Sequence, residues 1–259
     1  MTLDRPALTL AITKLARETG DKILTIYQQD FDVKTKTDSS PVTEADVEAE
    51  KIILKGLEEL TPDIPVLAEE SEAAGKVPDL SGGIFWLVDP LDGTKEFVQK
   101  RGEFTVNIAL VEQGRPTMGV IHVPVKDTTY YAEGSGKVWR QDGENEPKAI
   151  AARTPPAGGL TVVASRSHRT PETDDYIAKF EVAELISAGS SLKLCLLAEG
   201  KADLYPRFGR TMEWDIGAGQ AILEAAGGTV ETLDGAPLTY GKDGHDNPFF
   251  VAKGRPENS

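Results

Sequence analysis

The sequence has a single cysteine among its 259 residues, Cys195, so no intramolecular disulfide can form. This cysteine lies in an apolar stretch from Leu192 to Leu197, where a core position is the simplest interpretation. Long hydrophobic runs are also missing, because none reaches the roughly 18 to 20 apolar residues of a membrane-spanning helix. The charged residues Asp4 and Arg5 precede an amphipathic helical pattern, unlike a secretory signal. These absences predict an intracellular protein without an integral membrane segment.

Basic residues are scarce: 28 Lys and Arg stand against 42 Asp and Glu, for a net charge of −14. Nucleic-acid polymers and anionic membranes require basic surface, so neither is an expected partner. The acidic excess is uneven, since the window from 161 to 210 contains seven basic and seven acidic residues. Within this neutral window, His168, Lys193 and Arg207 are candidates for recognising an anion. Ordinary solvated surface is the alternative explanation.

Hydrophobic residues make up 39% of the chain, which supports a packed core in one large or two modest domains. Helical and strand patterns are mixed along the sequence. Helices are expected at about 4–29, 43–61, 190–199 and 215–226, and strands near 65–68, 84–88, 104–111, 118–123, 128–132, 137–139, 160–164, 185–187, 202–205, 228–231 and 248–252. The Pro- and Gly-bearing segment 153–159 is the best candidate boundary, which divides the chain into 1–155 and 156–259. Periodicity alone therefore predicts a mixed α and β protein with two subdomains.

The most informative segment is Asp89-Pro90-Leu91-Asp92-Gly93-Thr94, directly after the apolar run 84–88. That run is long enough for a buried strand, and Pro90 is expected to stop its ladder. Gly93 allows backbone to approach a ligand closely, and Thr94 offers a hydrogen-bond donor. Two aspartates three residues apart at a strand end repel each other unless a cation neutralises them. A metal and a phosphate could therefore meet here, although a simple turn with a helix cap is the alternative.

Three further carboxylates stand at the edges of expected elements. Glu69 follows a short strand pattern, Asp215 opens a small-residue helical stretch, and Asp46 lies near the start of another helix. Hard oxygen donors without His or Cys nearby favour Mg²⁺ or Mn²⁺ over zinc. Helix capping could explain Asp46, which lies three residues after Thr43, and a helix dipole could explain Asp215. A shared metal site accounts for all three carboxylates together.

Three motifs, in this order, resemble those of the inositol monophosphatase superfamily of magnesium-dependent, lithium-sensitive phosphatases: Ala68-Glu69-Glu70-Ser71, Asp89-Pro90-Leu91-Asp92-Gly93-Thr94 and Trp214-Asp215-Ile216-Gly217-Ala218-Gly219. Further segments resemble its bacterial 3'(2'),5'-bisphosphate nucleotidases: Asp38-Ser39-Ser40-Pro41-Val42-Thr43, Lys95-Glu96-Phe97, Gly102-Glu103-Phe104-Thr105-Val106-Asn107, Ser165-Arg166-Ser167-His168, Gly189-Ser190-Ser191-Leu192-Lys193 and Leu204-Tyr205-Pro206-Arg207. The resemblance spans nearly the whole chain, and the set of motifs is highly specific. Gly217 stands where many relatives carry alanine, a small departure that concerns helix packing and not a ligand.

The resemblance implies a layered α/β/α/β/α sugar-phosphatase-like fold, of the α+β or α/β class, with the active site between two subdomains. It implies two or three Mg²⁺ ions, or Mn²⁺ in their place, held by Glu69, Asp89, the Leu91 carbonyl, Asp92 and Asp215. It gives the catalytic role of positioning and deprotonating the attacking water to Asp46 and Thr94. It places substrate contacts at Glu69, Leu91, Asp92, Gly93, Thr94, Ser165, His168, Gly189, Lys193 and Asp215.

The implied reaction hydrolyses the 3'-phosphate of 3'-phosphoadenosine 5'-phosphate to give AMP and phosphate, in sulfur assimilation, with the sulfated analogue as a further substrate. Phosphate monoesters resist attack because the electrophile is itself anionic, so the site must supply positive charge and align a nucleophile. Thr94 alone is a poor base and would relay to Asp46. Lys193 as a point charge and His168 as a donor suit the phosphate that is retained.

The expected partner is thus a small nucleotide, not a nucleic-acid polymer. The expected location is the cytoplasm, either free or peripheral at the inner membrane, and the sequence leaves the oligomeric state open.

Two other classes of phosphatase are alternatives to a bisphosphate nucleotidase. An inositol or sugar monophosphatase would share the fold and the metals, but Lys95-Glu96-Phe97 and the segment from Ser165 to His168 favour the nucleotidase branch. A haloacid-dehalogenase-type phosphatase requires an aspartate nucleophile two residues before Asp92, where Pro90 stands. Turnover of the nucleotide compared with inositol 1-phosphate and fructose 1,6-bisphosphate separates the remaining possibilities.

A binding module without catalysis is the third alternative. An EF-hand would place acidic ligands one, three and five residues before its glycine, and before Gly93 these positions hold Asp92, Pro90 and Val88. A catalytically dead regulator would be expected to have lost part of the set that is present here, namely Asp46, Thr94 and Asp215.

Overall fold

The computed structural model describes residues 3–29, 31–35, 41–166 and 169–256. Its helices are α1 (Arg5–Tyr27), α2 (Glu44–Leu60), α3 (Glu69–Ala73), α4 (Thr94–Val98), the short 3₁₀ turn η1 (Pro124–Lys126), α5 (Pro171–Ile177), α6 (Leu192–Ala198) and α7 (Glu213–Ala225). Its strands are β1 (Val33–Thr35), β2 (Pro41–Thr43), β3 (Val66–Ala68), β4 (Ile84–Asp92), β5 (Thr105–Glu112), β6 (Arg115–Val123), β7 (Thr128–Gly134), β8 (Lys137–Asp142), β9 (Lys148–Ala149), β10 (Leu160–Ser165), β11 (Val182–Ala188), β12 (Leu204–Arg207), β13 (Thr229–Thr232) and β14 (Phe250–Lys253).

Two large sheets organise the described residues. The first runs β3-β4-β5-β6-β7-β8-β9, with β3 and β4 parallel and the other neighbours antiparallel. The second runs β11-β10-β12-β14-β13, in which β10 is parallel to β11 and β12. A short β1–β2 ladder stands apart from both.

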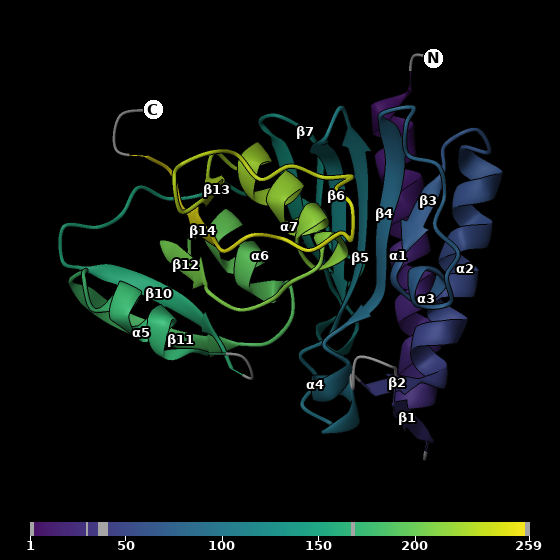
Figure 1. The fold of residues 1–259 in the computed structure, drawn as a ribbon, viewed down its shortest axis with the longest axis horizontal. Helices are drawn as coiled ribbons and strands as arrows, with labels where there is room; N and C mark the ends of the chain where they lie inside the picture. The colour runs from purple at the N-terminus through teal and green to yellow at the C-terminus, as the bar shows by residue number, and fades with distance from the viewer. Residues whose placement is uncertain (1–2, 30, 36–40, 167–168, 257–259) are drawn as a thin grey trace.

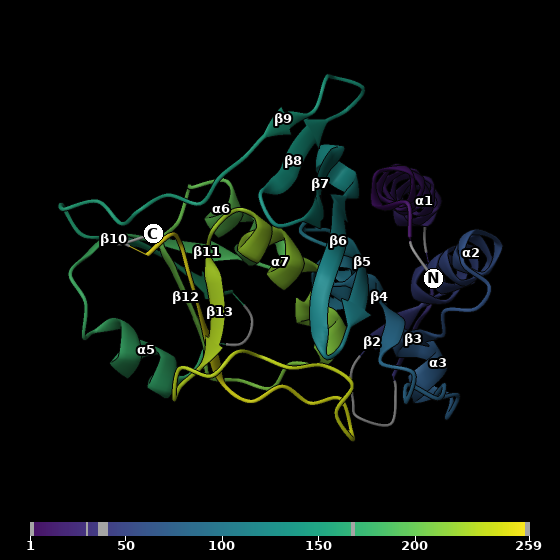
Figure 2. The same cartoon turned by 90° about the horizontal axis from the view of Figure 1, so that it is seen from above.

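The helices alternate with these sheets in layers (Figure 1). Seen from above in Figure 2, α1 and α2 cover one face of the seven-stranded sheet, and α7 packs on the other. Helix α6 contacts α7 and the five-stranded sheet, while α5 covers the far face of that sheet against β12. This α/β/α/β/α order confirms the predicted fold class.

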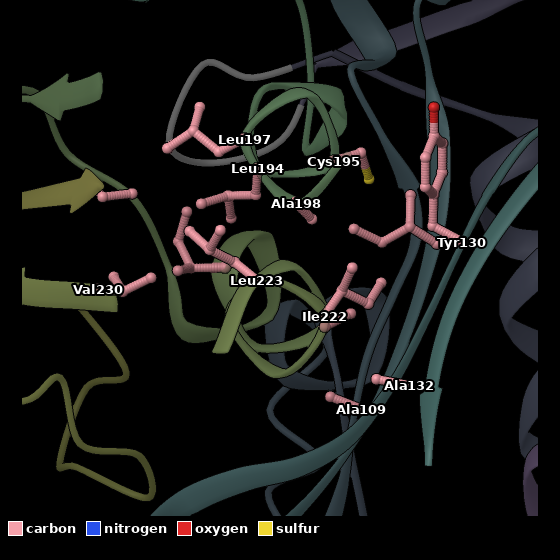
Figure 3. Close-up of a cluster of buried hydrophobic side chains, with 14 of the residues drawn as sticks. Ala109, Tyr130, Ala132, Leu194, Cys195, Leu197, Ala198, Ile222, Leu223 and Val230 are labelled. Atoms are coloured by element: carbon pink, nitrogen blue, oxygen red, sulfur yellow. The ribbon is translucent and has the colours of Figure 1, made fainter. Parts of the chain in front are cut away.

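One buried apolar cluster joins the two sheets through α6 and α7. Figure 3 shows Cys195 of α6 and Ile222 of α7 on the side of Tyr130 in the seven-stranded sheet, whereas Leu194 and Leu197 of α6 point away from that sheet. The same cluster continues into the five-stranded sheet. The predicted division into 1–155 and 156–259 therefore stays a prediction about folding units, since this core contains residues from both.

Long periodic elements lie where the sequence predicted them, as do short strands such as β3 and β12, whereas six other short elements were not predicted. The elements α3, α4, η1, β1, β2 and β9 span five residues or fewer, too few for a period to show. The prediction that Pro90 stops the ladder is wrong in part. Asp89 pairs with Asn107, the register shifts across Pro90 and Leu91, and pairing resumes at Asp92. Proline lacks an N–H, so the strand bulges there and continues.

Among the described residues, no helix has the length and apolar content that crossing a bilayer would require.

Helix α7, which carries Asp215, lies very close to the seven-stranded sheet because of its small residues and a glycine on β6. A Cβ on Gly119 would stand 2.6 Å from the backbone oxygen of Ala218. A Cβ on Gly217 would come within 3 Å of the Cδ2 atom of Leu87, at 2.7 Å, which is the far end of a flexible side chain, and its next neighbour would be Tyr240 at 3.4 Å. As predicted, Gly217 concerns helix packing.

We expect Gly119→Ala to lower the free energy of unfolding by about 1–3 kcal/mol, because backbone cannot yield as a side chain can. Gly217→Ala is the matched control and should change stability less, since Leu87 can rotate away. Denaturant titration of both variants measures the difference. Equal stability of the two would contradict a backbone-limited contact between β6 and α7.

Candidate functional site

The carboxyl end of β4 places two aspartates on either side of its bulge. Asp89 is 1% exposed, and its Oδ1 accepts a hydrogen bond of 3.0 Å from the Leu91 amide. Gly93 then takes a left-handed conformation with φ 93°, and a Cβ there would stand 3.0 Å from the Glu103 carbonyl oxygen. Glycine is thus required to turn the chain from β4 into α4.

Thr94, the first residue of α4, is joined to Asp46 on α2. The Thr94 hydroxyl lies 3.0 Å from Oδ1 of Asp46 and 3.3 Å from the Leu91 carbonyl oxygen. The other carboxylate oxygen of Asp46 accepts hydrogen bonds from the backbone amide and hydroxyl of Thr43, each 2.7 Å long. One oxygen of Asp46 therefore caps α2, as the capping explanation predicts, and the other contacts Thr94, so a role in the site remains compatible with capping.

Glu69 begins α3, and the buried Glu50 of α2 holds the residues that follow. The two Glu50 oxygens accept from the Glu70 amide at 2.7 Å and from the Ser71 hydroxyl at 2.6 Å. Helix α2 thus anchors both the loop that carries Thr94 and the turn that carries Glu69.

Asp215 lies in the first turn of α7, where its Oδ2 accepts from the Met212 amide at 2.9 Å. This contact fixes the carboxylate at the helix start and turns it towards β4. The Ser191 hydroxyl lies 2.7 Å from the Asp215 carbonyl oxygen and 2.7 Å from Oδ2 of Asp92. Asp92 and Asp215 are therefore bridged by one side chain.

The carboxylates are close enough to repel one another strongly. Burial raises the pKa of Asp89 well above its usual range, and the charges of Glu69, Asp92 and Asp215 raise it further. Burial, then the charges of Asp92 and Glu69, raise the pKa of Asp215 to about 8. Burial also raises the pKa of Asp92, although Lys193 and Ser191 oppose that rise. Such shared, desolvated negative charge is the environment that a cation relieves.

The donor set suits a hard divalent cation, because every candidate ligand offers oxygen. Within the described part of the chain, however, no three acidic, histidine or cysteine side chains already form a compact ion cage. The fit to a metal therefore rests on the chemistry of the donors and on their mutual repulsion.

A cavity of about 360 Å³ opens beside these carboxylates. Its wall includes the carboxylates of Glu69, Asp92 and Asp215, together with the basic side chains of Lys193 and Arg207. Both basic residues are largely buried, at 5% and 7% exposure. Burial and the neighbouring Arg207 lower the pKa of Lys193, and the Asp92 charge opposes them, for a pKa of about 8. The cavity therefore presents an acidic group of residues and a basic pair.

The structure brings together most of the residues predicted from sequence. Those that line the cavity are Glu69, Asp92, Gly93, Thr94, Ser165, Gly189, Lys193 and Asp215. Asp46, Asp89 and Leu91 lie behind these residues and contact them. The predicted contact at His168 and the motif residues Asp38-Ser39-Ser40 lie outside the described residues.

Sequence reasoning did not assign several residues that the structure places in the site. The side chains of Ser191 and Arg210 line the cavity. Glu50 lies outside the cavity wall and accepts a hydrogen bond from the Glu70 amide, next to Glu69. Arg207 was indicated by the charge balance of its window and by the motif Leu204-Tyr205-Pro206-Arg207, but no contact was assigned to it. No local pattern distinguishes these residues, because their roles depend on contacts between distant segments.

The raised carboxylate pKa values predict how the metal-free protein responds to pH. The folded state holds protons that the unfolded chain, with Asp pKa near 3.8, releases, so stability should fall as pH rises from about 4 to about 8. Asp215→Asn removes one repelling charge and should weaken this fall. Melting temperatures measured in chelator at about pH 5 and about pH 8 test it, with the exposed Asp79→Asn as control. An unchanged pH dependence in Asp215→Asn would contradict the coupling.

Comparison with known proteins agrees with this geometry. The model of the inositol monophosphatase family matches residues 4–249. The CysQ 3'(2'),5'-bisphosphate nucleotidase of Salmonella typhimurium is 46% identical over 243 residues, which cover 92% of this chain and 96% of that protein. The CysQ protein of Escherichia coli is 45% identical with the same coverage.

Solved structures show the same fold. The crystal structure of CysQ from Bacteroides thetaiotaomicron, described as a bacterial member of the inositol monophosphatase family, has a TM-score of 0.82 and 41% identity, covering 97% of this chain and 98% of that one. An IMPase of Thermotoga maritima has a TM-score of 0.77 and 26% identity, covering 97% and 92%. The match of the family model over most of the chain, together with these relatives, shows that this protein belongs to the inositol monophosphatase family.

Proposed function

We propose that this protein is a metal-dependent 3'(2'),5'-bisphosphate nucleotidase. It hydrolyses the 3'-phosphate of 3'-phosphoadenosine 5'-phosphate to AMP and phosphate, and also accepts the sulfated analogue, in the cytoplasm during sulfur assimilation. The names of relatives at 45% and 46% identity support this substrate class.

The single observation that carries the proposal is the opposed charge of the cavity. A substrate with one phosphate would be held by the acidic, metal-binding side alone. Here the cavity also presents two buried basic side chains, Lys193 and Arg207. The Nε atom of Arg207 is buried and has no hydrogen-bond partner among the described residues. A second anionic group on the substrate would satisfy this guanidinium, because a buried charged donor is stabilised by a charged acceptor.

The acidic side would hold the metal. Its proposed ligands are the carboxylates of Glu69, Asp89, Asp92 and Asp215 and the Leu91 carbonyl. We propose two or three Mg²⁺ ions, with Mn²⁺ able to replace them. Bound there, such ions would supply positive charge to the phosphoryl oxygens and lower the pKa of a coordinated water.

Asp46 and Thr94 would prepare the nucleophile. The Thr94 hydroxyl has one proton and two acceptors in reach, and Asp46 is both nearer, at 3.0 Å, and negatively charged. Donation to Asp46 leaves the lone pairs of Thr94 free to accept a hydrogen bond from water, and the water proton would pass to Thr94 as the Thr94 proton passes to Asp46. Because Thr43 holds the second oxygen of Asp46, this direction of donation is fixed before substrate arrives.

The nucleotide would lie between the two sides of the cavity. Ser165 ends β10, Gly189 follows β11, and Lys193 belongs to α6, so three neighbouring elements reach the same space. The Gly189 amide donates to Glu103 at 3.0 Å, which holds this loop against the segment that leads into β5. The proposed substrate contacts are Ser165, Gly189 and Lys193. The resemblance adds His168 to them.

A phosphate-release assay tests the proposed function. We expect 3'-phosphoadenosine 5'-phosphate to be hydrolysed faster than inositol 1-phosphate, which lacks a second anion for Lys193 and Arg207. It should also be hydrolysed faster than fructose 1,6-bisphosphate, in line with the names of the relatives. Activity should require Mg²⁺ and fall on addition of Li⁺. Faster turnover of inositol 1-phosphate would instead support the inositol or sugar monophosphatase alternative.

Lys193→Ala should raise the KM for the bisphosphate by about tenfold or more, since a hydrogen bond to a charged group is worth about 1.5–3 kcal/mol. The KM for a simple monophosphate should change less, because it lacks the second anion. Lys179→Ala, at an exposed position outside the cavity, is the charge-matched control. An equal rise of KM for both substrates would remove Lys193 from the second-anion site.

A further inference from the structure

Ser191 occupies an unusual position for a residue that precedes a helix. It is the N-cap of α6, yet its side chain makes no capping hydrogen bond to that helix. The residue is 3% exposed, and Ser190 before it adopts a positive φ of 45°. This left-handed step is uncommon for a residue other than glycine, so surrounding contacts must hold it. The turn aims the Ser191 hydroxyl away from α6 and towards β4.

Three groups from three other elements meet at that hydroxyl. Nδ2 of Asn107 on β5 donates to Ser191 Oγ at 2.8 Å, while Oδ2 of Asp92 and the Asp215 carbonyl oxygen each lie 2.7 Å away. Asn107 is 1% exposed and directly opposite Asp89 in the sheet. The site therefore gathers β4 and β5 from the first half of the chain, and α7 from the second half, around the side chain of Ser191.

The single proton of the hydroxyl decides what this arrangement can do. Asn107 occupies a lone pair of Ser191 Oγ, so the proton points to the side where Asp92 and Asp215 lie. A carboxylate is the stronger acceptor, and Asp92 also receives a hydrogen bond from the Ser191 backbone. Ser191 thus holds Asp92 through two donors, which restrict its rotation.

We infer that Ser191 is a positioning residue, oriented by Asn107, that fixes Asp92 for divalent-metal binding; this rests on the proposed function, in which Asp92 is a ligand. Partners that orient a ligating carboxylate commonly contribute about 10- to 100-fold to metal affinity. In the sequence, Ser191 also lies between Gly189 and Lys193, two of the proposed substrate contacts. The same segment therefore both holds Asp92 and lines the cavity proposed for the nucleotide.

Calorimetric titration of the whole protein with Mg²⁺ tests this inference without measuring turnover. We expect Ser191→Ala to weaken Mg²⁺ binding by about 10- to 100-fold. Ser191→Thr, which keeps the hydroxyl, should restore most of the affinity. Thr105→Val is the matched control: Thr105 lies opposite Asp92 in the sheet, and its buried hydroxyl has no partner among the described residues. That variant should bind Mg²⁺ like the parent protein.

The kinetic signature follows from the same argument. The Mg²⁺ concentration for half-maximal activity should rise in Ser191→Ala, with kcat recovered at saturating Mg²⁺. A lower kcat at saturating metal with unchanged Mg²⁺ affinity would overturn the inference. Should Ser191→Ala not fold, Ser191→Cys fills nearly the same space with a weak donor and should also bind Mg²⁺ more weakly.

The outcomes separate this inference from the proposed function. If the parent protein binds no Mg²⁺, or if Asp92→Asn binds it as well as the parent, the metal assignment fails. If the parent binds Mg²⁺, Asp92→Asn loses it, and Ser191→Ala or Ser191→Cys binds it with parental affinity, only the role of Ser191 fails.

Discussion

The structure depends on one constraint: several carboxylates must be held close together beneath the surface although they repel each other. Hydrogen bonds from the scaffold make this arrangement possible. The Leu91 amide holds Asp89, the Met212 amide holds Asp215, and Ser191 holds Asp92. Each donor offsets part of the free-energy cost of burying a carboxylate. Burial and the repulsion that remains raise the pKa values of Asp89 and Asp215. The buried carboxylates thus lower the stability of the metal-free protein, and a bound cation would relieve their repulsion. Sites that lower stability in this way are common where function requires buried charges.

The two sheets contribute opposite charges to one cavity. The seven-stranded sheet and its loops bring the acidic residues, whereas α6 and β12, beside the five-stranded sheet, bring Lys193 and Arg207. A protein with a net charge of −14 can therefore bind a polyanionic nucleotide, because the local field at the second anion differs from the overall charge. The α6–α7 layer also forms the main apolar core, so the packing that joins the halves sets the distance between the two charged sides.

Structural contacts and proposed functional roles coincide in single side chains here. Asp46 caps α2 with one oxygen and receives the Thr94 hydroxyl with the other, and Asp215 both caps α7 and faces Asp92. A carboxylate that caps a helix has a fixed orientation, which is what a site residue also needs. Helix capping and a role in the proposed site are therefore compatible at Asp46 and Asp215. The starts of α2 and α7 hold these two carboxylates in fixed orientations.

The sequence by itself determined the long helices, the buried strand before Asp89, the acidic motifs and their family resemblance, because each is a local pattern of residues. It did not determine that β4 continues past Pro90 to Asp92, since pairing of Asp92 with Thr105 depends on a neighbouring strand. Nor did it indicate that Ser191 turns away from its own helix to hold Asp92, or that Arg207 faces the cavity. Only the tertiary structure decided these points. Hydrogen bonds and charge contacts between residues about a hundred positions apart, such as Ser191 and Asp92, leave no periodicity in the chain.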